Sequence, residues 1–399
     1  MNILFLTMNV FTGIEMHNIY SDLMKEFIQC GHKPYIVTPR EKKLGESTEL
    51  IDCGDYGLLK VQIGNTSNVS LVEKGISTVT LSNRYFSAIR EKLGHLHFDL
   101  ILYSTPPITL ASPVKRLKKL FGCRTYLMLK DIFPQNAVDL GMFSRKSPIY
   151  RYFRAKEKLL YRVSDRIGCM SPANVEYLLQ HNPDIARERV EICPNAIIPH
   201  AEEDRQESKK ALREKYGIPE GAVVYLYGGN LGKPQGIPFI IECLKASKDR
   251  ADSYFIICGS GSEYGLLEEF IHAYRPANVK LVEFLPKEEY DLLAKGCDVG
   301  LVFLDYRFTI PNFPSRILSY MENAMPVLVC ADENTDLGAI AENNGFGLRC
   351  ASKDVRQFTN CLDMFDNTAI DTMGRKAREY LEEHYRSEDC YNIIMGAAD

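Results

Sequence analysis

Short apolar runs alternate with helical patterns along this chain, and the alternation restricts the possible folds more than any other feature. Ile3–Met8 has the pattern of a strand, residues 15–30 carry an apolar stripe at helical spacing, and a second apolar run begins at Tyr35. A strand, a helix and a strand of these lengths form a right-handed crossover unit, in which the two strands are parallel. The pattern therefore predicts an α/β chain built on parallel sheets.

The alternation continues to residue 192 and restarts after a polar tract. For residues 41–85 we expect loops and extra strands, with a helix from Leu81; clearer strands follow at 100–103, 125–129, 167–170 and 190–192. The tract His200–Lys210 marks a domain boundary. Six further strands are expected at 223–227, 255–258, 280–284, 299–304, 327–330 and 347–349.

This pattern predicts two doubly wound, Rossmann-like parallel-sheet domains that face each other across a cleft. The first covers residues 1–198 and the second residues 199–384. A C-terminal helix at about 385–399 would be able to pack back on the first domain. The length of 399 residues provides for two cores of this size.

Composition excludes several classes of protein. The chain is 45% hydrophobic and 25% charged, as in ordinary globular proteins, and its net charge of −4 argues against general nucleic-acid binding. No apolar run reaches the roughly 18 residues of a membrane span, and the sequence starts directly on a strand without the marks of an export signal. We therefore expect a cytoplasmic location.

The sequence gives no indication of a bound metal or other cofactor. Its 12 cysteines occur singly, without the two-residue spacing of a zinc site or redox motif, which favours reduced structural thiols. There is also no Asp-x-Asp pair of the kind that clamps a diphosphate through a metal ion.

Ligands of open parallel sheets bind outside the carboxyl ends of the strands, so the loops that follow the strands are the candidate sites. In the second half, the loop Gly228–Gly236 holds four glycines and Lys233 before a helix, a composition that suits a phosphate cradle. It matches neither a Walker loop nor G-x-G-x-x-G, and a tight exposed connection explains it equally well. Gly259–Ser262 opens another helix, whose cap Glu263 is expected to complete.

Two further loops of the second half are candidates. The backbone at Phe284 and Leu285 could hold a flat base, although a surface turn is the simpler interpretation. In the segment Pro311–Val329, Ser315 is a natural helix N-cap, and Arg316 places a cationic fork on the first turn, which suits phosphate. An ordinary capped helix is the alternative.

In the first half, Asp131 follows the end of a strand and is expected to face the cleft, near Gln135 and Asn136. A carboxylate there could orient or deprotonate a sugar hydroxyl, or it could serve a turn. Gly13, in the polar turn after the first strand, is placed on the same side. The segment Arg145–Arg162 carries seven basic residues and one acid among aromatics, so it could meet an anionic membrane surface or form a solvated helix face.

The chain resembles the retaining nucleotide-sugar glycosyltransferases of the GT-B fold, carbohydrate family four. The resemblance covers nearly the whole length and is carried by short markers in a specific order: Gly31-His32, Pro194-Asn195, the Gly228–Gly236 loop, Gly259-Ser260-Gly261, Phe284-Leu285-Pro286, Pro314-Ser315-Arg316, Tyr320-Met321 and Pro326-Val327. Residues 130–141 and 229–236 look like a bacterial subgroup that builds O-antigen or capsule and includes N-acetyl-fucosamine-type transferases.

The resemblance implies transfer of a sugar from a nucleotide-diphosphate donor, with a UDP-sugar favoured, to a lipid-linked saccharide by a front-face displacement that retains configuration. No metal is expected to be required. With the basic segment Arg145–Arg162, we expect a peripheral protein on the inner face of the plasma membrane. The implied catalytic residues are Asp131, Lys233 and Arg316. Donor binding is assigned to Gly229, Asn230, Lys233, Gln235, Gly259, Phe284, Leu285, Pro314, Ser315, Arg316 and Ser319, and the acceptor side to Gly13, Asp131, Gln135 and Asn136.

The sequence departs from the family pattern in the donor site. The family usually has a ribose-binding glutamate at the position of Ser319 and often another near Pro311, and this chain has neither, although Glu322 follows one helical turn later. Two alternatives therefore stay open: a non-catalytic GT-B partner of a transferase complex, and a sugar-nucleotide epimerase on the same architecture.

Overall fold

The computed structural model describes residues 1–65 and 71–396, which form two compact units. The first unit contains Met1–Ile198 together with the C-terminal segment that begins at Ser387, and the second contains Pro199–Arg386. The boundary expected from the sequence lies between the same residues, 198 and 199.

The first unit is built on an eight-stranded sheet with the order β3-β4-β2-β1-β5-β6-β7-β8. Every neighbouring pair is parallel except β3 and β4, which run antiparallel at one edge. The strands are β1 (Asn2–Leu6), β2 (Lys33–Glu41), β3 (Glu49–Asp52), β4 (Gly57–Ile63), β5 (Leu100–Ser104), β6 (Arg124–Leu129), β7 (Arg166–Cys169) and β8 (Val190–Ile192). The helices are α1 (Ile19–Gln29), α2 (Leu71–Leu93), α3 (Ala111–Phe121), α4 (Gln135–Asp139), α5 (Pro148–Val163), α6 (Pro172–His181) and α15 (Ser387–Gly396).

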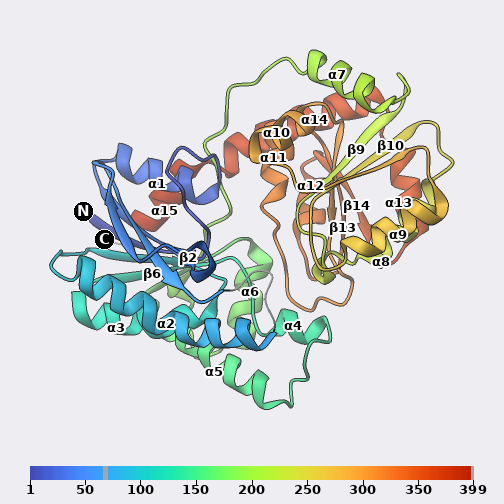
Figure 1. The fold of residues 1–399 in the computed structure, drawn as a ribbon. Coiled ribbons are helices and arrows are strands. Elements are labelled where there is room, and N and C mark those ends of the chain that lie inside the picture. The colour runs from blue at the N-terminus through green and yellow to red at the C-terminus, as the bar shows by residue number, and fades with distance from the viewer. Residues whose placement is uncertain (66–70, 397–399) are drawn as a thin grey trace. The chain divides into compact units, whose positions relative to one another are not determined.

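Alternate residues of each strand enter two separate cores, one on each face of this sheet. Leu4 and Leu6 pack with α2, α3 and α5, whereas Ile3 and Phe5 pack with α1 and α15. Helix α15, red in Figure 1, lies beside the blue α1, so the end of the chain completes the core of the first unit.

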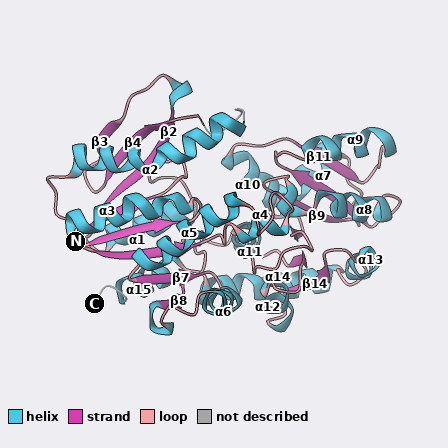
Figure 2. Cartoon of the chain, turned by 90° about the horizontal axis from the view of Figure 1, so that it is seen from below, coloured by secondary structure: helices cyan, strands magenta, loops and turns pink. Residues whose placement is uncertain are grey.

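The second unit has a six-stranded sheet with the order β11-β10-β9-β12-β13-β14, in which all pairs are parallel. Its strands are β9 (Val223–Gly228), β10 (Ser253–Cys258), β11 (Val279–Val282), β12 (Val299–Phe303), β13 (Val327–Ala331) and β14 (Gly347–Ala351). Its helices are α7 (Gln206–Tyr216), α8 (Ile237–Ser247), α9 (Tyr264–Tyr274), α10 (Lys287–Lys295), α11 (Arg316–Glu322), α12 (Leu337–Asn343), α13 (Val355–Leu362) and α14 (Asn367–His384). Figure 2 shows the strands of each unit flanked by helices.

These two sheets confirm the predicted pair of Rossmann-like, parallel-sheet domains. In the least periodic part of the sequence, the structure differs from the prediction: α2 begins at Leu71, ten residues before the predicted start at Leu81. Among the described residues, no helix combines the length and the apolar character that crossing a membrane requires.

Candidate functional site

The loops that follow β9 and β10 lie against each other at the carboxyl edge of the second sheet. The Gly229 amide donates to the Cys258 carbonyl at 2.9 Å, and the Leu231 amide donates to the Ser260 carbonyl at 2.8 Å. A Cβ added to Gly259 would lie 1.8 Å from the Gly229 carbonyl oxygen, and φ at Gly259 is +152°. Only glycine fits this position, so the two loops form one backbone surface.

The Arg316 guanidinium lies against this surface. Its carbon is 4.5 Å from the centroid of the Tyr227 ring, and a Cβ on Gly229 would come within 3.2 Å of it. The Nη1 atom of Arg316 is buried and has no hydrogen-bond partner among the described residues. Because leaving a buried donor unpaired costs about 1–3 kcal/mol, an acceptor that reached Nη1 would recover that free energy.

Nearby tyrosines keep this guanidinium charged. Burial opposes the charge, but the oxygens of Tyr227 and Tyr320 favour it, and together these effects raise the pKa of Arg316 above its ordinary value. A permanent cation with an unused donor therefore faces the glycine-rich loop, which is a suitable arrangement for binding a phosphate group.

Both tyrosines also fix the loop. Neither was predicted as a site residue from the sequence, although Tyr320 is among the markers of the family resemblance. The Gly228 amide donates to the Tyr320 hydroxyl at 3.1 Å, and the Tyr227 hydroxyl donates to the Asn230 carbonyl at 2.6 Å. A Cβ on Gly300 would lie 2.3 Å from the Tyr320 ring. A glycine inside the apolar strand β12 was the available signal, since such a glycine often marks a close approach of another group.

The middle of the glycine-rich loop is a short 3₁₀ turn over Lys233–Gln235. The side-chain Oε1 of Gln235 accepts from Asn230 Nδ2 at 2.9 Å and from the Gly232 amide at 3.3 Å, so these side chains hold the shape of the loop. Lys233 is exposed and lines a cavity of about 380 Å³ on the same unit.

The start of α11 differs from the sequence prediction. Ser315 has helical φ and ψ of −65° and −16°, its side chain makes no capping hydrogen bond, and it is exposed. Ser315 and Glu263 do stand at the N-cap positions of α11 and α9, but neither side chain makes the predicted capping hydrogen bond. Helix α11 has only seven residues, so the Arg316 side chain rather than the helix end supplies the positive charge here. Pro314 precedes Arg316 in the sequence and Ser319 follows it, and both residues are half-buried.

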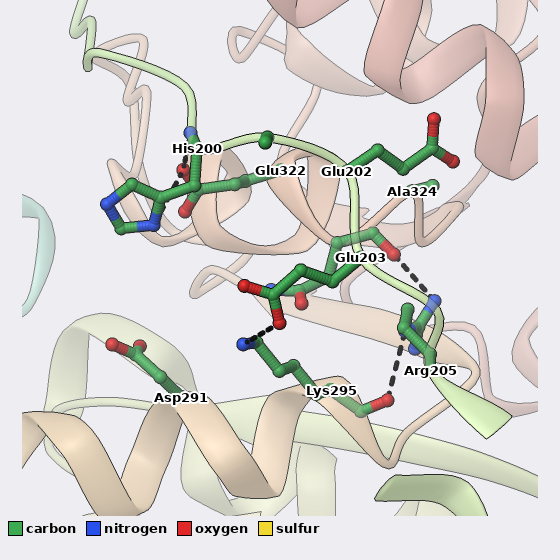
Figure 3. Close-up of a pocket in the computed structure, with 10 residues that line it drawn as sticks. His200, Glu202, Glu203, Arg205, Asp291, Lys295, Glu322 and Ala324 are labelled. Atoms are coloured by element: carbon green, nitrogen blue, oxygen red, sulfur yellow. Dashed lines mark hydrogen bonds and ion pairs between the residues drawn. The ribbon is translucent and has the colours of Figure 1, made fainter. Parts of the chain in front are cut away.

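Glu322 is engaged at the junction with the linker. Its Oε1 accepts from the His200 amide at 2.9 Å, beside a pocket of about 280 Å³ that Figure 3 shows. In that pocket Arg205 donates to the carbonyls of Lys295 and Asn323, at 2.9 and 2.5 Å. These polar groups connect the start of the second unit to the ends of α10 and α11, and Glu322 takes part in this junction.

The loop after β11 presents an apolar surface. Phe284 is 72% exposed and Leu285 is half-buried. The Cys258 thiol donates to the Glu283 carbonyl at 3.5 Å, which ties this loop to the end of β10. The loop therefore adjoins the glycine surface described above.

In the first unit, Asp131 follows β6 in a tightly bonded loop. The Asp131 amide donates to Thr105 Oγ1 at 3.1 Å, and Asn136 Nδ2 donates to both carboxylate oxygens, at 2.9 and 3.1 Å. Burial raises the pKa of Asp131 to about 6, although the Ile132 amide and Asn136 act in the opposite direction. A carboxylate with this pKa exchanges a proton near neutral pH, as a general base must.

The other predicted acceptor-side residues are less closely connected to Asp131. Gln135 donates to the Asp139 carboxylate at 2.6 Å. Gly13 lies in the loop between β1 and α1, where an added Cβ would be 3.8 Å from the Tyr56 hydroxyl. Of the four predicted residues, Asp131 and Asn136 are thus in direct contact.

Comparisons with known proteins agree for both halves of the chain. Residues 13–200 match the family model Glycosyltransferase Family 4, and residues 208–387 match the model Glycosyl transferases group 1. A relative from Pseudomonas aeruginosa, "Probable glycosyltransferase WbjE", is 24% identical over 293 residues, which are 72% of this chain and 71% of the relative.

A second relative and a solved structure are similar in the same way. WcaI of Escherichia coli (strain K12), described as a colanic acid biosynthesis glycosyl transferase, is 24% identical over 250 residues, 61% of this chain and 60% of the relative. The crystal structure of Anabaena Alr3699/HepE in complex with UDP and glucose superimposes with a TM-score of 0.72 at 15% identity, covering 99% of this chain and 98% of that one. At this identity the superposition establishes the fold alone.

Proposed function

We propose that this glycosyltransferase of the GT-B fold, whose two halves match the family 4 and group 1 models, transfers a sugar from a UDP-sugar to a lipid-linked saccharide. The reaction would belong to the synthesis of a surface polysaccharide and would retain the configuration of the transferred sugar. The description of WcaI as a glycosyl transferase of colanic acid biosynthesis and the UDP complex of HepE support this choice of pathway and donor.

We infer the position of the donor site from one observation. Arg316 has a buried, unpartnered Nη1 beside the glycines at the end of β9. The diphosphate would lie against Gly229 and Gly259, with Arg316 and Lys233 as its cationic contacts and the Phe284 loop on the side of the base. In a retaining front-face displacement the leaving diphosphate develops negative charge, so cations placed there stabilise the transition state, and the proposal needs no metal ion.

The acceptor role is assigned to Asp131 in the first unit. Asn136 holds the carboxylate in one orientation, and we propose that Asp131 then orients the attacking hydroxyl of the acceptor. The leaving phosphate would assist in removing the hydroxyl proton, so no covalent carboxylate intermediate is required.

A nucleotide titration tests this function. We expect UDP to raise the melting temperature of the purified protein more than ADP or GDP does, because binding to the native state alone stabilises it by mass action. Incubation with UDP-sugars and a lipid-linked acceptor should then yield the elongated saccharide. If no nucleotide diphosphate shifts the melting temperature, the non-catalytic partner is the better interpretation, and release of a modified nucleotide sugar without transfer would indicate the epimerase.

The membrane partner is proposed from the surface of α5. Arg151, Lys158 and Arg162 are exposed, and so are the neighbouring apolar side chains Ile149 (54%) and Tyr152 (44%). Arg154 is different, because it forms an ion pair with Glu157 at 2.6 Å and donates to the His181 carbonyl at 2.9 Å. The exposed cations next to apolar side chains have the character of a surface that binds anionic lipid headgroups.

Replacing Arg151, Lys158 and Arg162 together by Gln should lower binding to vesicles that contain phosphatidylglycerol by at least about tenfold, since each basic residue near such a surface contributes about 1 kcal/mol. Co-sedimentation measures this, with phosphatidylcholine vesicles as the control to which both proteins should bind weakly. Equal binding of the variant and the wild type to the anionic vesicles would favour a simple solvated helix face.

A further inference from the structure

A cavity of about 380 Å³ on the second unit lies beside the glycine-rich loop and takes no part in the site described above, apart from the shared Lys233. Its walls come from the loops that follow four strands, β9, β10, β12 and β14, and from the first turn of α8. The side chains that define it are Lys233, Phe239, Glu263, Tyr306, Arg307 and Ser352. The volume falls within the ~300–1,000 Å³ typical of small-molecule sites.

Two buried polar atoms at this cavity have no partner among the described residues. Ser352 is 2% exposed and its Oγ makes no hydrogen bond. Glu263 Oε2 is also buried and unpaired. Each such atom costs about 1–3 kcal/mol, and two of them beside one cavity indicate that a ligand with hydrogen-bonding groups completes the site.

The charges around the cavity restrict the kind of ligand. Arg307 forms a double contact with Asp305, Nε to Oδ1 and Nη2 to Oδ2, both at 2.8 Å, so this pair is neutral as a unit. Among the residues that line the cavity, the remaining charges are the Lys233 ammonium and the Glu263 carboxylate, which have opposite signs. A free phosphate would meet the carboxylate and a cation would meet the ammonium, whereas a neutral ring with many hydroxyl groups can donate to one and accept from the other.

Aromatic side chains add a surface for the apolar face of such a ring. Tyr306 is 53% exposed and Phe239 is half-buried. Lys353 lies over the Tyr306 ring, with its Nζ 5.7 Å from the centroid. An aromatic wall with a few converging polar groups is the usual composition of a specific small-molecule site.

We propose that this cavity is a saccharide subsite that takes one hexopyranose ring, with Ser352 and Glu263 as the groups that bind its hydroxyls. The proposal rests on the proposed function, because a sugar could reach the cavity either as part of the donor or as part of the acceptor. The shared chemistry is the polyhydroxylated ring, and the experiment has to distinguish the two sources.

Calorimetric titration with UDP, UDP-glucose, UDP-galactose and UDP-N-acetylglucosamine provides the first arm, and saturation-transfer NMR with free glucose and N-acetylglucosamine provides the second. The variants are Ser352→Ala and Glu263→Gln, which remove one hydrogen-bonding group or one charge with little change of shape. Glu269→Gln is the matched control, since Glu269 is exposed on the helix α9 that follows Glu263.

If the cavity binds the sugar of the donor, Ser352→Ala should weaken at least one UDP-sugar about fivefold and Glu263→Gln about tenfold, while UDP binds as to the wild type. If it binds a sugar of the acceptor, the UDP-sugars should be unaffected and the NMR signal of a free monosaccharide should be lost in both variants. The proposal is overturned if both variants bind every sugar ligand as the wild type and the control do. Failure of UDP to bind the wild type would instead count against the donor site, and the NMR arm would still decide on the cavity.

Discussion

Arg316→Met is expected to bind UDP about a hundredfold more weakly than the wild type and yet to remain as stable. In the free protein, the Arg316 side chain is half-buried and its buried Nη1 is unpaired, so methionine, which has a similar length, removes a buried donor that costs about 1–3 kcal/mol. It also removes the contact with the Tyr227 ring, worth about 0.5–2 kcal/mol. Since the two terms offset each other, the free energy of unfolding should change by less than about 1 kcal/mol.

The effect on binding has no such compensation. A charge-assisted, forked contact to a diphosphate is among the strongest polar interactions, and its loss at a buried position costs about 2–5 kcal/mol. Calorimetric titration with UDP and chemical denaturation measure the two quantities. Arg316→Lys should recover only part of the affinity, because an ammonium cannot reproduce the planar fork. Arg356→Met, at an exposed position of α13, is the control; if Arg316→Met bound UDP as that control does, the donor site would lie elsewhere.

The fold could be predicted from the sequence because its signal is local and repeated. Buried parallel strands such as Val299–Phe303 and Val327–Ala331 are uninterrupted apolar runs, and a helix follows each of these two. Between residues 41 and 85 the apolar pattern does not identify the strands. There β3 is a short antiparallel edge strand whose residues are half-buried or exposed. Edge strands of this kind lack the apolar run that identified the others.

The candidate site could be predicted only in part, and for a different reason. Loop composition identified the stretch that contains Gly229 and Lys233, because glycines are needed where two backbones approach closely. Tyr320 lies one helical turn after Arg316 on α11, whereas Tyr227, near the end of β9, contacts Arg316 only through tertiary packing. The same holds for Ser352, which lies 125 residues after Tyr227 and follows β14 at the edge of the sheet. Residue spacing carries no information on such contacts.

Asp131→Asn is expected to abolish most transfer activity while stabilising the protein at neutral pH. Burial raises the pKa of Asp131 to about 6 from an ordinary value of 3.8, so the folded state holds its proton to a higher pH than the unfolded state does. Between these two values the folded protein binds more protons, and its stability therefore falls as the pH rises through that window. Above about pH 6 the wild type has lost this whole contribution to its free energy of unfolding, about 3 kcal/mol at most.

Asparagine cannot ionise, so the variant should not lose stability as the pH rises. Its amide oxygen can still accept a hydrogen bond from Asn136. Denaturation curves should show no gain for Asp131→Asn at pH 4 and a gain of about 2–3 kcal/mol at pH 7.5. If the ionised carboxylate orients the acceptor hydroxyl, wild-type transfer should rise with pH around 6, and the variant should be at least about a hundredfold slower with no such rise. Asp184→Asn, at an exposed position after α6, should change neither profile. A stabilised variant that kept the wild-type rate would show that Asp131 serves only its loop, whereas loss of activity together with the gain in stability identifies a carboxylate retained for its chemistry at a cost to the fold.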